Sequence, residues 1–211
     1  MLTIYDYDAS PNCLKTKILV KELGLEYRER WLTREELRGP EFRAQFPTGQ
    51  APAIEDGNVR IAESGAIALY LAHQHGRLIP EQPESRALMF QALLVEASLL
   101  APTVGGQGLF GELSKPEAER NLARIAELAE KAVRVGRILS ELLGDRPYFA
   151  GEFSLADIQL YAATSKALAH DVFGEAPKNL VAWHTRMTAR PAVKAAREEY
   201  VHYRASAVAA E

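Results

Sequence analysis

The chain has 211 residues and a formal net charge of −3, and 47% of its residues are hydrophobic while 25% are charged. This is ordinary globular composition, which excludes a disordered tail protein, and the slightly acidic balance argues against nucleic-acid binding. The single cysteine cannot form an internal disulfide, and the N-terminus lacks the basic start and apolar run of a secretory signal. We find no uninterrupted apolar run of the roughly 18 residues that a membrane span needs. We therefore expect a soluble cytoplasmic protein that contacts neither membrane nor nucleic acid.

The first third of the chain alternates predicted strands with predicted helices. A short buried strand is predicted over residues 2–6, and a helix over residues 11–23. Pro11 suits the first position of this helix and Gly24 suits its end. The pattern continues with a strand, a short helix, a hairpin with Asp-Gly at its tip and a further helix, over residues 27–31, 40–46, 53–61 and 64–75.

Two prolines, Pro80 and Pro83, break this alternation and predict a linker over residues 79–84. The sequence beyond the linker is permissive for helix nearly throughout. Ser154 and Asp157 form a capping box that marks one helix start. The predicted helices cover residues 85–100, 116–143, 155–169, 179–189 and 191–203. We therefore expect a small α/β domain over residues 1–78 and an all-helical domain over residues 85–211.

Two short segments in the first third indicate a binding site. In Gln50-Ala51-Pro52 a proline stands where a strand begins, and a cis peptide bond there would turn the backbone groups of Ala51 away from the sheet and leave them free for a peptide-like ligand. Ser64, which follows Glu63, is predicted as the N-cap of the next helix, whose N–H groups and dipole favour a carboxylate. Taken alone, Pro52 is also explained as an edge-strand proline, and Ser64 as an ordinary N-cap. Their order and spacing favour a site for a small peptide that carries an α-carboxylate and an α-amine.

With the Ser10-Pro11-Asn12-Cys13 turn, the Pro52 segment, Glu63-Ser64 and the late capping box in one order, the chain resembles the cytosolic glutathione S-transferases. The resemblance covers essentially the whole length, and it is to bacterial members of the serine type or the disulfide-reducing type. It implies a thioredoxin-like N-terminal domain of βαβ-ββα order followed by a helical C-terminal domain. It also implies a homodimer and a role in detoxification.

The resemblance assigns Ser10 as the catalytic residue. Its hydroxyl would donate to the sulfur of glutathione and, with the helix N-terminus, would favour the reactive thiolate. A plain N-cap is the alternative interpretation of Ser10, and Asn12 is an alternative hydrogen-bond donor to the sulfur. Cys13 completes a Cys-x-x-Cys-like spacing, but with Ser10 in place of the first cysteine no protein dithiol exists. We expect Cys13 to be buried and structural.

The same resemblance implies how glutathione would be held. Ala51, next to Pro52, would pair its backbone with the cysteinyl residue of glutathione. Glu63 would contact the γ-glutamyl ammonium and Ser64 the γ-glutamyl carboxylate, while Gln50 would add a polar contact. Three cations are weak candidates for the glycyl carboxylate: Lys15, Arg34 and Arg38. We interpret the two arginines as part of a solvated helix face.

An apolar electrophile would lie near Tyr7, Phe110 and Tyr203, although such aromatic residues are more often part of a core or rim. The histidines lack metal-ligand spacing, so we expect no metal, and glutathione acts as co-substrate with no further cofactor. The expected function is conjugation of glutathione to the electrophile. The alternatives are a glutathione-dependent disulfide reductase or peroxidase, and a non-catalytic interaction module of the same fold.

Overall fold

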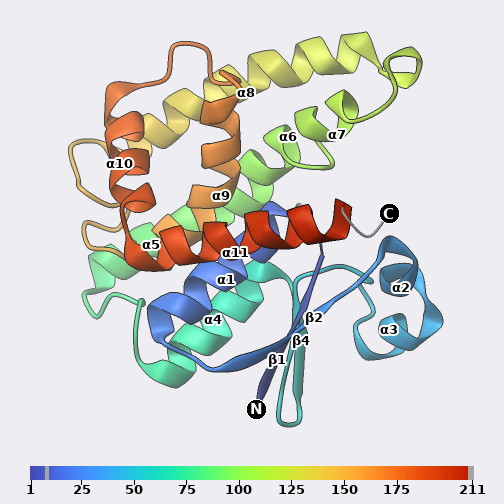
Figure 1. Ribbon diagram of the computed structural model, residues 1–211. Coiled ribbons are helices and arrows are strands. Elements are labelled where there is room, and N and C mark those ends of the chain that lie inside the picture. Colours follow the sequence, from blue (N-terminus) through green and yellow to red (C-terminus); the bar gives the residue numbers. More distant parts are fainter. Residues whose placement is uncertain (8–9, 209–211) are drawn as a thin grey trace. The chain divides into compact units, whose positions relative to one another are not determined.

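The computed structural model describes residues 1–7 and 10–208, with side chains described to residue 200 (Figure 1). Contacts divide the chain into two compact units. The first unit combines Met1–Arg77 with Ala189–Glu211, and the second is Leu78–Thr188.

The first unit is a mixed four-stranded sheet with helices on its two faces (Figure 1). Its strand order is β2-β1-β3-β4, in which β1 and β2 are parallel and the other neighbours are antiparallel. The elements, in chain order, are β1 (Leu2–Asp6), α1 (Pro11–Leu23), β2 (Tyr27–Trp31), α2 (Arg34–Arg38), α3 (Pro40–Gln45), β3 (Ala53–Asp56), β4 (Val59–Ala62), α4 (Ser64–His75) and α11 (Pro191–Val208). The predicted βαβ-ββα order is confirmed, and α2 is a helix that the sequence did not separate from its surroundings.

Successive side chains of β1 point alternately to the two faces of this sheet. Ile4 and Asp6 point to one face and are fully buried there, where the Asp6 carboxylate meets Lys17 of α1. Tyr5 points to the other face, where its ring packs against Phe42 and Phe46 of the α3 region at centroid distances of 5.7 and 5.2 Å. The sheet is therefore covered on both sides, and the end of β1 carries a carboxylate into the interior.

The last helix, α11, packs against α1 in the first unit. Arg190, just before α11, donates two hydrogen bonds to Glu22 of α1, at 2.7 and 2.9 Å. Lys21 and Tyr27 both bond Glu199 of α11. Ala189–Glu211 is thus grouped with the N-terminal unit, whereas the sequence predicts a single helical domain over residues 85–211.

The second unit is entirely helical in its regular elements. These are α5 (Pro83–Val95), a π-helical turn (Glu96–Leu100), α6 (Ala101–Val104), α7 (Leu109–Leu113), a 3-10 turn (Glu117–Glu119), α8 (Leu122–Leu143), α9 (Leu155–Ala169) and α10 (Lys178–Thr188). The structure differs from the prediction by more than one residue at the starts of α5 and α8. The first helix begins inside the predicted linker, at Pro83, because proline suits a first helical position. The long helix begins at Leu122, where Asn121 accepts a hydrogen bond from the Arg124 N–H as N-cap.

One helical run, Pro83–Leu113, is long and apolar enough to cross a membrane by length and composition alone. A single run of this kind is a weak indication, because core helices of soluble proteins meet the same criterion. The expectation that the chain has no membrane span stays a prediction.

The predicted capping box at the start of α9 is confirmed and is fully buried. Asp157 accepts hydrogen bonds from the backbone N–H of Phe149 at 3.1 Å, from that of Ser154 at 3.0 Å and from the indole of Trp183 at 2.9 Å. Burial raises the pKa of Asp157 to about 6, although these bonds favour its charged form. One carboxylate thus joins the loop before α9, the cap of α9 and the centre of α10.

Candidate functional site

Strand register brings the predicted binding segments together at one end of the sheet. Tyr5 of β1 pairs with Ala53 of β3, and Ala53 pairs with Ala62 of β4. The chain that leaves β1, the chain that enters β3 at Pro52 and the chain that leaves β4 at Glu63 are therefore neighbours. Helices α1 and α4 both begin at this end, so two helix N-termini lie beside the same three segments.

The segment before β3 has the backbone geometry that the sequence indicates. The Ala51–Pro52 peptide bond is cis, as expected. Pro52 is buried, Ala51 is half-buried against the aromatic cluster under β1, and Gln50 is exposed. Because β3 begins at Ala53, Ala51 lies outside the strand ladder.

The start of α4 differs from the prediction in one respect. The expectation that Ser64 is the N-cap is wrong: Glu63 is the N-cap, and Ser64 is the first helical residue. Glu63 has a φ of +75°, an uncommon conformation for a residue with a side chain and one that concentrates at functional sites. Its exposed side chain makes no capping hydrogen bond. The turn therefore presents the Glu63 carboxylate outside the helix, next to the backbone N–H groups of the first turn.

Ser10 is the N-cap of α1, and its hydroxyl oxygen accepts a hydrogen bond from the Cys13 N–H at 3.4 Å. This confirms the N-cap interpretation of Ser10. A hydroxyl that accepts one bond still carries a proton to donate. The N-cap role is therefore compatible with the predicted catalytic role, which stays a prediction.

Asn12 is exposed in the first turn of α1, and its amide oxygen accepts a hydrogen bond from the Lys15 ammonium at 2.8 Å. The amide N–H groups of Asn12 are then the part of this side chain that can donate to a ligand. Lys15 is only 1% exposed. Its ammonium is thus engaged with Asn12, which does not favour Lys15 as the partner of a glycyl carboxylate.

The other two candidate cations, Arg34 and Arg38, are exposed on α2, as a solvated helix face requires. A hydrogen bond between Arg34 and the side chain of Tyr7 raises the pKa of Arg34. Tyr7 directly follows β1, so this contact holds Arg34 near the end of the sheet where the binding segments meet. No feature of the sequence pattern pairs these two residues.

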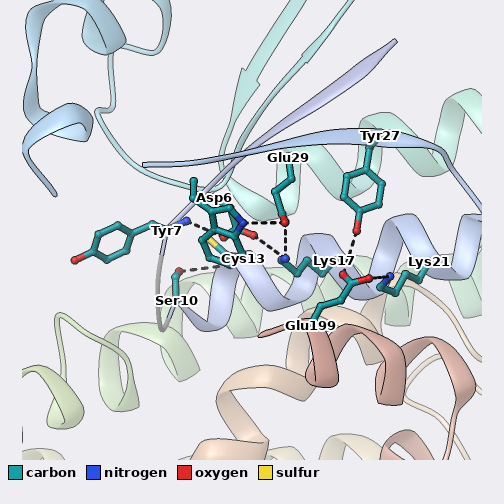
Figure 2. A network of polar contacts seen from close by, with 10 residues as sticks. Asp6, Tyr7, Ser10, Cys13, Lys17, Lys21, Tyr27, Glu29 and Glu199 are labelled. Carbon is teal, nitrogen blue, oxygen red and sulfur yellow. Dashed lines mark hydrogen bonds and ion pairs between the residues drawn. The ribbon is translucent and has the colours of Figure 1, made fainter. Parts of the chain in front are cut away.

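Figure 2 shows a buried charged cluster next to the candidate site. Sequence reasoning missed this cluster. Asp6 is fully buried and accepts a hydrogen bond from the Tyr7 N–H at 2.7 Å. The fully buried Lys17 ammonium lies 3.4 Å from Asp6 and also forms an ion pair with Glu29 of β2. The Trp31 ring lies 4.4 Å from the same ammonium. Asp6 closes an apolar strand and Lys17 lies one helical turn beyond Cys13, but neither position alone reveals a buried ion pair.

Cys13 connects this cluster to Ser10. Its side chain is 1% exposed, so the expected burial is confirmed. Burial and the neighbouring Asp6 carboxylate raise the pKa of the Cys13 thiol far above its ordinary value. The thiol is therefore neutral, and the backbone N–H of Cys13 donates a hydrogen bond to the hydroxyl oxygen of Ser10 (Figure 2).

Of the three aromatic residues predicted to contact an electrophile, Tyr7 is half-buried in the first unit. Phe110, in α7 of the second unit, is 9% exposed and packs edge-on against His170 at 5.3 Å. The Lys166 ammonium lies 4.2 Å from the centroid of the Phe110 ring. The side chain of Tyr203 lies outside the described residues. The contact of these residues with a second substrate stays a prediction.

Within the part of the chain that the structure describes, no group of three or more His, Cys, Asp or Glu side chains is arranged to hold a metal ion. The expected absence of a metal stays a prediction.

Comparison with protein families gives two matches that together span most of the chain. Residues 4–83 match the glutathione S-transferase N-terminal domain, and residues 104–191 match the glutathione S-transferase C-terminal domain. Glutathione S-transferase 4 of Zea mays is 31% identical over 209 residues, which cover 90% of this chain and 88% of that protein. The disulfide-bond oxidoreductase YfcG of Escherichia coli is 28% identical over 208 residues, which cover 91% of this chain and 92% of that protein.

Solved structures with similar folds carry glutathione in two forms. A glutathione transferase from Pseudomonas putida, with one glutathione disulfide bound per subunit, has a TM-score of 0.83 and 26% identity. That comparison covers 92% of this chain and 90% of the other. A glutathione transferase from Burkholderia graminis, with two glutathione molecules bound per subunit, has a TM-score of 0.84 and 26% identity, covering 92% of this chain and 86% of the other.

Proposed function

The chain belongs to the glutathione S-transferase family, and we propose that it binds glutathione, stabilises its thiolate and conjugates it to an apolar electrophile. The observation that carries this proposal is the register of β1, β3 and β4. It gathers the Ser10 turn, the Ala51-Pro52 segment and Glu63 around one end of the sheet, where α1 and α4 begin.

The chemistry at this end of the sheet suits thiol activation. A thiol is a weak nucleophile until it is deprotonated, because the thiolate is the reactive species. A hydroxyl donor at Ser10 and the positive end of the α1 dipole both favour the charged sulfur. Holding this sulfur beside the electrophile supplies the remaining rate gain through proximity.

The geometry also supports the arrangement of the tripeptide. Ala51 lies outside the ladder, so its backbone is placed to pair with the cysteinyl residue, and Gln50 lies exposed beside it. The exposed Glu63 carboxylate suits the γ-glutamyl ammonium, and Ser64 with the first turn of α4 suits the γ-glutamyl carboxylate. Each charged end of the γ-glutamyl group thereby has a partner of opposite sign.

We expect Glu63→Gln to weaken glutathione binding about 10- to 100-fold, because a charge-assisted bond to the ammonium becomes a neutral one. Isothermal titration calorimetry measures this change. Glu41→Gln, which alters another exposed carboxylate, on α3, serves as the matched control and should bind normally. Equal affinities for the two variants would remove Glu63 from the proposed site.

A second candidate function is the reduction of disulfides by glutathione. The similarity to YfcG supports it, and so does the exposed Asn12 in the first turn of α1, where it can donate to a second sulfur. Parallel assays of conjugation to a chlorodinitrobenzene-type acceptor and of hydroxyethyl-disulfide reduction distinguish the two activities. A higher rate of conjugation than of disulfide reduction supports the first function, and a higher rate of disulfide reduction supports the second. No turnover in either assay, with no binding of glutathione, would instead indicate an interaction module.

We further propose that the enzyme acts as a cytoplasmic homodimer in detoxification. The apolar side chains of Phe90 and Leu94 on α5, 44% and 68% exposed, support association with a second copy. A fold without an internal disulfide supports a reducing compartment. Light scattering of the wild type and of Leu94→Glu tests the dimer, which the charged variant should dissociate.

A further inference from the structure

The side chain of Asn12 is held by a buried ammonium from the same helix. The Lys15 ammonium donates a hydrogen bond to the Asn12 amide oxygen at 2.8 Å, and the two residues lie three positions apart, which places them on one face of α1. Lys15 is 1% exposed, whereas Asn12 is exposed in the first turn of the helix. This bond therefore runs from the interior of the first unit to its surface.

An ammonium fixes the orientation of an amide group, because it has three donors and no acceptor. Only the oxygen of the Asn12 amide can face it, so the NH₂ group is turned away from the buried ammonium and toward the surface. A glutamine in place of Lys15 would not impose this orientation, since a glutamine amide both donates and accepts. The positive charge also polarises the Asn12 amide, which makes its outward N–H groups stronger donors.

These N–H groups lie at a place that favours an anionic ligand. Asn12 is the second residue of α1, in the same turn that Ser10 caps, and the positive end of the helix dipole lies there. An ammonium removed from water is costly unless it is paired, so Lys15 is not a solubilising surface charge. Its burial behind Asn12 instead leaves the amide N–H groups as the outermost donors of this pair.

We propose that Lys15 is a positioning residue, which orients and polarises the Asn12 amide so that Asn12 donates a hydrogen bond to the sulfur of bound glutathione beside Ser10. The inference rests on the proposed function, in which the start of α1 stabilises the thiolate. Lys15 does not contact glutathione in this scheme and acts only through Asn12. The thiolate then has two donors from one turn, the hydroxyl of Ser10 and the amide of Asn12.

The test is an ultraviolet titration of the thiolate of glutathione bound to the full-length protein. We expect Lys15→Met to raise the pKa of the bound thiol by about 0.5 to 1 unit, because the Asn12 amide is no longer fixed with its N–H groups outward. Asn12→Ala should raise this pKa at least as much, since it removes the donor itself. Lys21→Met is the matched control: it removes another ammonium of α1, which pairs with Glu199, and should leave the pKa unchanged.

A double variant decides whether Lys15 acts through Asn12. We expect Lys15→Met to add no further rise in pKa when Asn12 is already alanine. A rise of the same size in both backgrounds would show that the ammonium acts on the sulfur directly, which overturns the inference. An unchanged pKa in Lys15→Met overturns it as well.

Lys15→Gln covers the case in which Lys15→Met does not fold. Glutamine is uncharged and can bond the Asn12 amide in either orientation, so the pKa of the bound thiol should again rise, and the wild-type value in this variant would contradict the inference. Ser10→Ala separates the inference from the proposed function. If neither Ser10→Ala nor Asn12→Ala raises the pKa, the proposed function itself fails, whereas a rise in Ser10→Ala alone contradicts only the role of Lys15 and Asn12.

Discussion

Ser10→Ala lowers kcat/KM for glutathione conjugation by about 10- to 100-fold and raises the pKa of the bound thiol by about 1 to 2 units. The reason is that a hydrogen bond to a charged acceptor is among the stronger ones, and the alanine variant cannot donate it. The dipole of α1 remains in this variant, so part of the thiolate stabilisation persists. Steady-state kinetics as a function of pH measures both quantities.

Two variants control this result. Ser10 also caps α1, so alanine costs about 1 kcal/mol of stability as well, and Ser10→Thr keeps both the hydroxyl and the cap. We expect Ser10→Thr to retain most of the activity. Asn12→Ala tests the alternative donor, and a greater loss in Asn12→Ala than in Ser10→Ala would transfer the catalytic role to Asn12.

Asp157→Ala lowers the free energy of unfolding by about 3 kcal/mol or more, because it leaves three buried donors without their acceptor. These donors belong to three separate segments of the helical unit, so the loss loosens the loop before α9, the cap of α9 and its contact with α10. Urea unfolding followed by circular dichroism measures the change.

Graded replacements separate the contributions of this carboxylate. Asp157→Asn keeps an oxygen for Phe149 and Trp183, which share one carboxylate oxygen, and loses only the bond from Ser154. Ser154→Ala removes a capping hydroxyl and should cost about 1 kcal/mol. A stability loss in Asp157→Ala no larger than that in Ser154→Ala would show that the three donors find other partners.

Local stop and start signals made most of the fold predictable from sequence. The bounds of α1 follow from Pro11 at its first position and from Gly24, whose φ of +71° ends the helix. The hairpin follows from Asp56-Gly57, and α9 follows from its capping box. By contrast, the attachment of α11 to α1 depends on partners more than 160 positions apart in the chain, such as Arg190 and Glu22, and no local pattern encodes it.

The candidate site likewise has one part that the sequence predicts and another part that it does not. The Pro52 segment and Glu63 are recognisable because proline and the helix start constrain the backbone locally. The error at Ser64 is a shift of one position, since the positive φ of Glu63 lets the helix begin directly after it. Asp6 and Lys17 were missed because the burial of a charged side chain depends on the tertiary pairing of β1, α1 and β2, which residue type alone does not reveal.

A crystal structure with bound glutathione tests the central claim most directly. The account predicts a sulfur within hydrogen-bonding distance of the Ser10 hydroxyl, a cysteinyl backbone paired with Ala51 and a γ-glutamyl ammonium at Glu63. A glutathione molecule bound away from this end of the sheet, or one whose sulfur contacts neither Ser10 nor the first turn of α1, would contradict it.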